Sequence, residues 1–201
     1  MHNDVERFSR WAPNYDRHYL QRRVFEPVQR IVLDLAAAEV PHPGAILDVG
    51  CGTGRLLREA EQRFAGARLE GIDAAEGMVE EARSAASGSS IGFRQGTAEQ
   101  LPFGEAEFDL VFSTMTFHHW ADQGEAIREI ARVLKPQGRW LLADFIATGP
   151  MRLVFAVVRP RRFHTRARMD SLLAPAQLRV MAERRVPGLW GQVSALAIGR
   201  R

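Results

Sequence analysis

The chain has 201 residues, of which 46% are hydrophobic and 25% charged, and this length and composition predict one globular domain with a buried core. A net charge of +3 is too small to indicate nucleic-acid binding, no apolar run is long enough to span a bilayer, and the charged N-terminus lacks the apolar core of a signal peptide. The single cysteine, Cys51, excludes a disulfide within the chain and favours a cytoplasmic location.

Strand and helix patterns alternate along most of the chain. The expected helices cover residues 24–39, 55–64, 76–86 and 125–134, and the expected strands cover residues 45–49, 68–72, 92–95, 108–113 and 140–145. Two more strands, 184–189 and 192–198, are separated by so few residues that they can form only an antiparallel hairpin, because a parallel return needs a crossover of a dozen or more.

This order predicts an α/β fold with a doubly wound, mostly parallel sheet of seven strands whose last strand is antiparallel. We expect a single domain over residues 1–201. Residues 1–43 form a helical cap before the first strand, with one helix, and residues 146–183 form an insertion that carries helices after the fifth strand.

The segment 46–55 reads Ile-Leu-Asp-Val-Gly-Cys-Gly-Thr-Gly-Arg, so that a strand ends in a loop with glycine at every second position. Glycine has no Cβ and tolerates positive φ, which lets the main chain approach a ligand closely. A dinucleotide loop requires a third glycine where Arg55 stands, and a phosphate-binding P-loop requires a Gly-Lys pair that is missing. The loop alone also fits a tight turn in some other α/β protein.

The pattern acidic-x-G-x-G-x-G resembles motif I of the class I S-adenosylmethionine-dependent methyltransferases, whose fold is Rossmann-like. In that family the loop passes beneath the methionine and ribose parts of the cofactor. The resemblance implies that five residues of the loop bind S-adenosylmethionine, namely Asp48, Gly50, Cys51, Gly52 and Gly54.

Asp73 ends the second strand about 20 residues after the loop, where an acid accepts hydrogen bonds from ribose hydroxyls. It could also cap the helix that begins near Ala74, and the two roles are compatible. The segment 73–78 resembles the family pattern D-x-S-x-x-M, which implies that Ala74 contacts the cofactor and that Met78 packs against the adenine. The alternative for Met78 is ordinary helix core.

The segment 96–103 resembles the family pattern G-D-A-E-x-L-P-F, in which the aspartate binds the adenine amino group. This chain has Thr97 at that position. An uncharged hydroxyl makes a weaker hydrogen bond than a carboxylate, so we expect the backbone N–H of Ala98 to share in holding the adenine edge.

Residues 108–113 resemble motif IV, and Ser113 at the end of this strand is expected to contact the cofactor. The following residues lack the [DN]-P-P-[YF] motif of amino methyltransferases, and the one cysteine lies in the glycine loop, which disfavours covalent attack on a pyrimidine. His118 and His119 follow the carboxyl end of the strand, where such sheets bind ligands. Either one could serve as a general base, with His118 slightly favoured, or the pair could be structural. No metal site is expected.

The segment 8–16 resembles the F-x-x-x-A-x-x-Y-D opening of the ubiquinone/menaquinone-type, or type 11, methyltransferases. The resemblance implies that it covers the cofactor, with Tyr15 near the methionine end; the alternative is an aromatic staple. The arginine-rich segment 159–168 could face anionic lipid, bind an acidic substrate or be a solvated surface.

The resemblance implies in-line methyl transfer from S-adenosylmethionine to oxygen or carbon of a small acceptor, with S-adenosylhomocysteine as product. The acceptor, apolar or phenolic, is expected beneath residues 1–20 and 146–170. Alternatives are a non-catalytic S-adenosylmethionine-binding protein and a phospholipid or nucleic-acid methyltransferase, although no stable nucleic-acid binding is expected. A nicotinamide-dependent reductase is disfavoured because its Tyr-x-x-x-Lys pair is missing. Monomer and homodimer both stay open.

Overall fold

The structure is a computed structural model that describes residues 2–15, 25–146, 164–187 and 193–200. The strands are β1 (Ala45–Val49), β2 (Arg68–Asp73), β3 (Gly92–Gln95), β4 (Phe108–Thr114), β5 (Leu134–Phe145), β6 (Leu178–Arg185) and β7 (Val193–Arg200). The α-helices are α1 (His2–Tyr15), α2 (Glu26–Glu39), α3 (Arg55–Arg63), α4 (Glu76–Ala85), α5 (Gln123–Val133) and α7 (Arg166–Leu173). Two short 3₁₀ turns are η2 (Phe117–His119) and η3 (Ala174–Ala176).

The strands form one sheet in the order β3-β2-β1-β4-β5-β7-β6. Strands β1 to β5 pair in parallel, whereas β7 is antiparallel to both of its neighbours. The predicted fold, with its antiparallel last strand, is therefore confirmed. The strand order reverses between the paired strands β1 and β4, so that α3, which follows β1, and α5, which follows β4, cover opposite faces of the sheet. Ligands bind at this point in doubly wound sheets.

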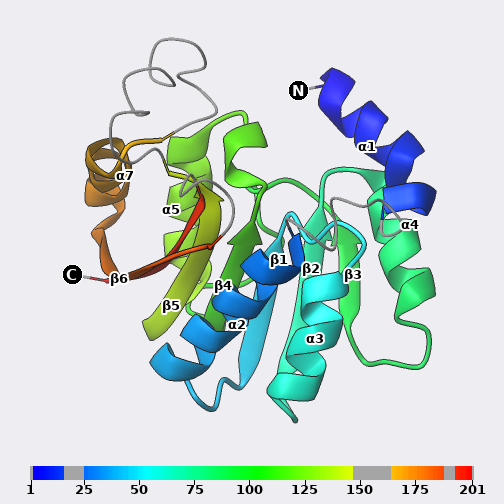
Figure 1. Cartoon of the computed structure of the whole chain (residues 1–201), viewed down its shortest axis with the longest axis horizontal. Coiled ribbons are helices and arrows are strands. Elements are labelled where there is room, and N and C mark those ends of the chain that lie inside the picture. Colours follow the sequence, from blue (N-terminus) through cyan, green and yellow to red (C-terminus); the bar gives the residue numbers. More distant parts are fainter. Residues whose placement is uncertain (1, 16–24, 147–163, 188–192, 201) are drawn as a thin grey trace.

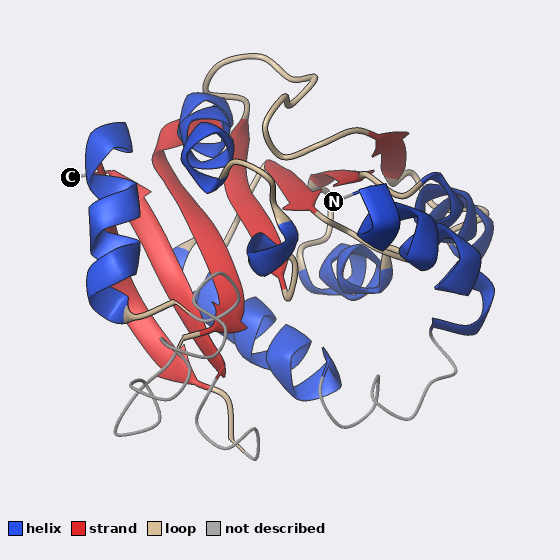
Figure 2. Ribbon diagram, turned by 90° about the horizontal axis from the view of Figure 1, so that it is seen from above, coloured by secondary structure: helices blue, strands red, loops and turns tan. Residues whose placement is uncertain are grey.

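Helices cover both faces of the sheet, so the core has two halves (Figures 1 and 2). On one face, α2, α3 and α4 pack against side chains such as Ile46, Leu110 and Leu141. On the other face, α5 and α7 pack against Leu47 and its neighbours. Every residue of β1 is buried, as expected for a central parallel strand that both layers cover.

Strand β5 begins six residues earlier than predicted. Pro136 and Gly138 are residues typical of a turn, but the chain passes directly from α5 into β5 at Leu134. Phe108 pairs with Leu134 and Leu110 pairs with Arg139, so residues 135–138 bulge from the ladder. A bulge accommodates Pro136, which has no N–H to donate to a neighbouring strand.

Two further boundaries differ from the prediction. Strand β6 begins at Leu178, so all but its last two residues lie inside the predicted insertion 146–183, and the end of the predicted strand 184–189 lies outside the described residues. As an edge strand, β6 carries many charged side chains, which conceals its pattern. The N-terminal region has two helices, α1 and α2, where one was predicted. None of the helices in the described part of the chain has the length and apolarity to cross a membrane.

Candidate active site

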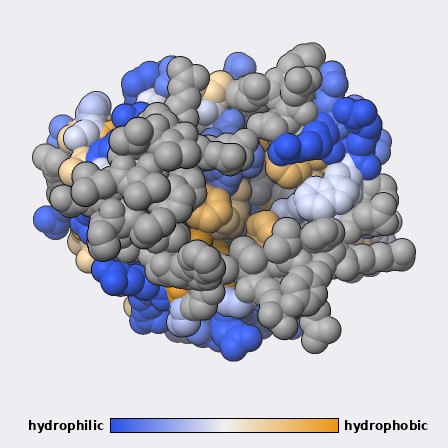
Figure 3. All heavy atoms as spheres, turned by 45° about the horizontal axis from the view of Figure 1, so that its top comes forward, coloured by the Kyte–Doolittle hydropathy of each residue, from blue (hydrophilic) through white to orange (hydrophobic). Residues whose placement is uncertain are grey.

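A cavity opens at the carboxyl end of β1, β2 and β4, and Figure 3 shows hydrophobic side chains gathered in a hollow at this end of the molecule. Its volume is about 860 Å³, including solvent at its mouth, which is the size of a small-molecule site. Its lining residues come from α1, the glycine loop, the start of α4 and the segments after β3 and β4. Among the predicted site residues, those in the wall are Tyr15, Gly50, Gly52, Asp73, Ala74, Met78, Thr97, Ala98 and His119.

The glycine loop takes a conformation that side chains rarely allow. Gly50, Gly52 and Gly54 have φ of 81°, 53° and 73°. A Cβ on Gly50 would lie 2.3 Å from the Thr116 hydroxyl, and one on Gly54 would lie 2.6 Å from the Phe93 ring. A Cβ on Gly52 would meet nothing within 4 Å. Gly50 and Gly54 are therefore required by packing, whereas Gly52 leaves open space beside the cavity.

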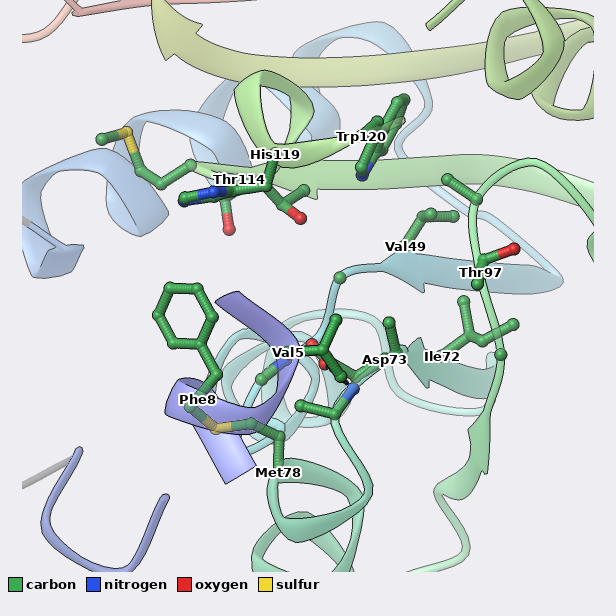
Figure 4. A pocket seen from close by; sticks show the side chains of 18 of the residues that line it. Val5, Phe8, Val49, Ile72, Asp73, Met78, Thr97, Thr114, His119 and Trp120 are labelled. Carbon is green, nitrogen blue, oxygen red and sulfur yellow. Dashed lines mark hydrogen bonds between the residues drawn. The ribbon is translucent and has the colours of Figure 1, made fainter. Parts of the chain in front are cut away.

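Asp73 links this loop to α4. Its carboxylate accepts one hydrogen bond from the Gly52 N–H, at 2.9 Å, and another from the Ala75 N–H, also at 2.9 Å. Burial raises the pKa of Asp73, and these two N–H groups oppose that rise. The carboxylate also lines the cavity, so its remaining lone pairs can face a ligand (Figure 4).

Asp48 is a buried acid on β1, beneath the loop. Its Oδ1 has no hydrogen-bond partner among the described residues. Burial, followed by repulsion from Asp73, raises the pKa of Asp48 to about 8. At neutral pH this carboxyl is therefore mostly protonated. A cationic ligand nearby would lower the pKa of Asp48 and so favour its charged form.

We expect Asp48→Asn to flatten the pH dependence of stability. The unfolded chain releases the Asp48 proton near pH 3.8 and the folded chain near pH 8, so the folded state binds more protons between these values. The free energy of unfolding then falls as pH rises through this window, by up to about 1.4 kcal/mol per pH unit. Urea unfolding at pH 5, 6, 7 and 8 measures this. Parallel curves for variant and wild type would contradict the burial of this acid.

The part of the cavity wall formed by Thr97, Ala98 and Met78 is less polar than the part around Asp73. Thr97 and Ala98 follow β3, and among the described residues nothing accepts a hydrogen bond from the Ala98 N–H. Met78 is buried and packs with Ala75, which directly precedes α4, and with Ala12 of α1. This wall offers an apolar slot with an uncharged hydroxyl and a main-chain N–H at its edge, which suits a flat heteroaromatic ring.

Helix α1 closes one side of the cavity with Val5 and Phe8 (Figure 4), and Tyr15 of the same helix also lines the cavity. Tyr15 also packs edge-on against Trp11, with ring centroids 5.2 Å apart. The structure thus combines the two interpretations of this segment, since Tyr15 both lines the cavity and packs within an aromatic group. Asp16 of the motif lies outside the described residues.

Gly77 of α4 permits α1 to dock. A Cβ there would lie 2.5 Å from the Ser9 carbonyl oxygen and 3.0 Å from the Ser9 Cα, and backbone atoms cannot move aside as a side-chain end can. We expect Gly77→Ala to displace α1 and weaken S-adenosylhomocysteine binding by about tenfold or less, while α4 gains about 1 kcal/mol in helix propensity. Calorimetry and thermal unfolding test both effects. Glu80→Ala, an exposed change on the same helix, is the control and should bind as the wild type does.

Several predicted residues lie behind the wall. The Cys51 thiol packs in the core, 3.0 Å from where a Cβ on Gly71 would be, and burial raises its pKa. Ser113 is fully buried, and its hydroxyl accepts a hydrogen bond from the Trp140 indole at 3.2 Å. Because side chains alternate along a strand, its neighbour Thr114 lines the cavity instead.

The two histidines have different surroundings. The His118 ring lies 2.8 Å, Nδ1 to Oδ1, from the carboxylate of Asp144 at the end of β5, and its backbone N–H donates to the other carboxylate oxygen at 3.2 Å. Asp144 is fully buried. His119 lines the cavity and packs edge-on against Phe8, with ring centroids 5.4 Å apart. His118 is thus held in one orientation with Nε2 directed away from its partner acid.

Asp144 was missed by the sequence analysis. The sequence holds a weak indication of its role. Asp144 lies near the end of the fifth strand, and the ends of parallel strands meet at the sheet edge where the residues after β4 also lie. Of the apolar residues just after β4, Phe117 is fully buried in the core and Met115 lines the cavity. Among the described residues, no group of three or more His, Cys, Asp or Glu could hold a metal ion.

Comparison with known proteins identifies the family. The profile of the methyltransferase-domain family matches residues 47–142. The chain is 36% identical over 166 residues to demethylmenaquinone methyltransferase of Deinococcus radiodurans, which covers 78% of this chain and 68% of that protein. The chain belongs to the class I S-adenosylmethionine-dependent methyltransferases. The chain spans between 51 and 68% of the length of three curated relatives it matches.

Solved structures of methyltransferases share the fold of this chain. A chain from the complex of the Haloferax volcanii Trm112 methyltransferase activator with a methyltransferase superimposes with a TM-score of 0.79, at 21% identity, over 96% of this chain and 98% of that one. The 1,6-didemethyltoxoflavin-N1-methyltransferase of Burkholderia thailandensis, solved with its substrate and S-adenosylhomocysteine, gives 0.75 at 22% identity, over 100% and 88%. At these identities the likeness supports the fold alone.

Proposed function

We propose that this protein transfers a methyl group from S-adenosylmethionine to a hydroxyl or acidic carbon of a small-molecule acceptor, with His118 as general base. The observation that carries the proposal is the buried His118–Asp144 pair, which lies at the same sheet edge as the glycine loop and Asp73. Relatives named as demethylmenaquinone and ubiquinone-biosynthesis O-methyltransferases support a small acceptor.

The cavity fits the cofactor. The open space beside Gly52 admits main-chain contact with the methionine part, Asp73 has lone pairs for the ribose hydroxyls, and the unpaired Oδ1 of Asp48 suits a nearby cationic group. Met78, Ala74, Thr97 and Ala98 form the adenine side, and Thr114 replaces Ser113 in the proposed set. When bound, S-adenosylmethionine supplies a methyl group activated by the sulfonium charge.

The protein's main task is alignment. The methyl donor is held by the glycine loop, Asp73 and α1. The wall towards the acceptor is formed by His119 and Trp120. Helix α1 and the aromatic side chains exclude water from the reacting atoms. His118 Nε2 takes the proton that the acceptor hydroxyl loses, and Asp144 accepts a hydrogen bond from Nδ1–H and stabilises the resulting imidazolium.

A methyl-transfer assay tests this proposal. S-adenosylmethionine with a labelled methyl group is incubated with the protein and a panel of phenols, quinols and hydroxy acids, and label is sought in the extracted acceptor. We expect methylated product that depends on His118 and the release of S-adenosylhomocysteine. Tight S-adenosylhomocysteine binding with no methylated product from the whole panel would instead favour a non-catalytic binding protein.

A further inference from the structure

A second cavity adjoins the first. It has a volume of about 1,120 Å³, including solvent at its mouth, and lies between η2, the start of α5 and α7. His119 and Trp120 line both cavities, so the two spaces share a wall. Its described lining residues are His118, His119, Trp120, Ala121, Asp122, Gln123, Gly124, Arg168 and Leu172.

The base faces this second cavity. His118 lines it and does not line the cavity of the glycine loop. Because Asp144 occupies Nδ1, only Nε2 is available to a proton donor. An acceptor whose hydroxyl gives its proton to His118 must therefore reach into the second cavity. The same hydroxyl oxygen attacks the methyl group where the two cavities adjoin, beside His119, whose ring centroid lies 4.1 Å from that of His118.

Helix α7 contributes a positive charge to the lining of the second cavity. Arg168 and Leu172 are four residues apart on α7 and so lie on one face of the helix. In the described part of the chain no ion pair or hydrogen bond occupies the Arg168 guanidinium. Arg166, two residues before it, is instead paired with Asp170 and Glu183.

The acids near this cavity are already engaged. The Asp122 carboxylate accepts a hydrogen bond from the Glu125 N–H and caps α5. The Glu99 carboxylate accepts from the N–H groups of Ala121 and Asp122. Arg168 thus adds a positive charge to the lining of a cavity whose neighbouring carboxylates already accept hydrogen bonds from main-chain N–H groups. An arginine fork is well suited to a carboxylate or a phosphate.

We propose that the second cavity is the acceptor site and that the acceptor carries an anionic group, a carboxylate or phosphate oxyanion, which pairs with Arg168. Its apolar body packs on Leu172 and Trp120, and its hydroxyl meets His118. This inference rests on the proposed function. It assigns a hydroxy acid, and not a neutral quinol, as the acceptor class.

Calorimetry on protein saturated with S-adenosylhomocysteine tests the proposal. The probes are aromatic and aliphatic hydroxy acids, each beside its neutral carboxamide. We expect at least one acid to bind about tenfold or more tightly than its amide, and Arg168→Ala to lose that advantage without changing amide binding. Arg179→Ala removes an exposed charge on β6, outside the cavity, and should match the wild type.

Three results would overturn the proposal: no binding by any acid, equal binding of acids and amides, or the same loss in Arg179→Ala. Saturation with S-adenosylhomocysteine is measured first. Failure at that step counts against the proposed function as well, whereas saturation followed by any of the three results counts against the acceptor class alone. Retained cofactor binding in Arg168→Ala shows that the variant is folded.

Discussion

His118→Ala is expected to lower kcat for a hydroxyl acceptor by about 10²- to 10⁴-fold, because the variant cannot accept the acceptor's proton. His118 is outside the wall of the glycine-loop cavity, so the Kd of S-adenosylhomocysteine should stay unchanged. Steady-state kinetics and calorimetry measure the two quantities. Added imidazole should restore part of the rate, since it can occupy the space of the missing ring.

Two further variants distinguish the catalytic role of His118 from the roles of its neighbours Asp144 and His119. Asp144→Asn preserves shape but cannot accept from Nδ1–H as the carboxylate does, so we expect kcat to fall about tenfold or more with unchanged cofactor and acceptor Kd. His119→Ala should affect binding more than kcat, because His119 forms the shared wall. Full rates in both His118→Ala and His119→Ala would rule out a histidine base.

Asp73→Ala is expected to weaken S-adenosylhomocysteine binding by about 100-fold or more. The change removes a charged acceptor for the ribose hydroxyls, and each such hydrogen bond contributes about 1.5–3 kcal/mol. It also frees the N–H groups of Gly52 and Ala75, which loosens the loop beneath the cofactor. Isothermal calorimetry gives the change in Kd.

Glu76→Ala is the matched control for Asp73→Ala. Glu76 is an acid of the same segment, three residues further on, but it is exposed and lies outside the cavity wall. It should bind as the wild type does. If Asp73→Ala also bound normally, or if both variants lost affinity equally, Asp73 would not be the ribose ligand.

The sheet and the glycine loop were predictable because their signals are local. A buried parallel strand reads as a short apolar run, and positive φ at Gly50, Gly52 and Gly54 demands glycine. Helix α1 was missed because its position depends on Gly77, some 70 residues away, whose missing side chain lets the two backbones touch.

The candidate base site was only half predictable. The sequence shows His118 and His119 but not which one is oriented, since that depends on Asp144, brought beside His118 by the parallel pairing of β4 and β5. Ser113 was predicted and Thr114 was not, because the sequence does not show which side chains of β4 face the cavity. Only the structure shows that the Ser113 hydroxyl turns towards Trp140.

Calorimetry of the wild type with S-adenosylhomocysteine tests the central claim most directly, because it needs no knowledge of the acceptor. We predict one site per chain, a Kd in the micromolar range or below, and loss of that binding in Asp73→Ala. No heat of binding in wild-type protein that unfolds cooperatively would contradict the assignment of the glycine-loop cavity, and with it the proposed function.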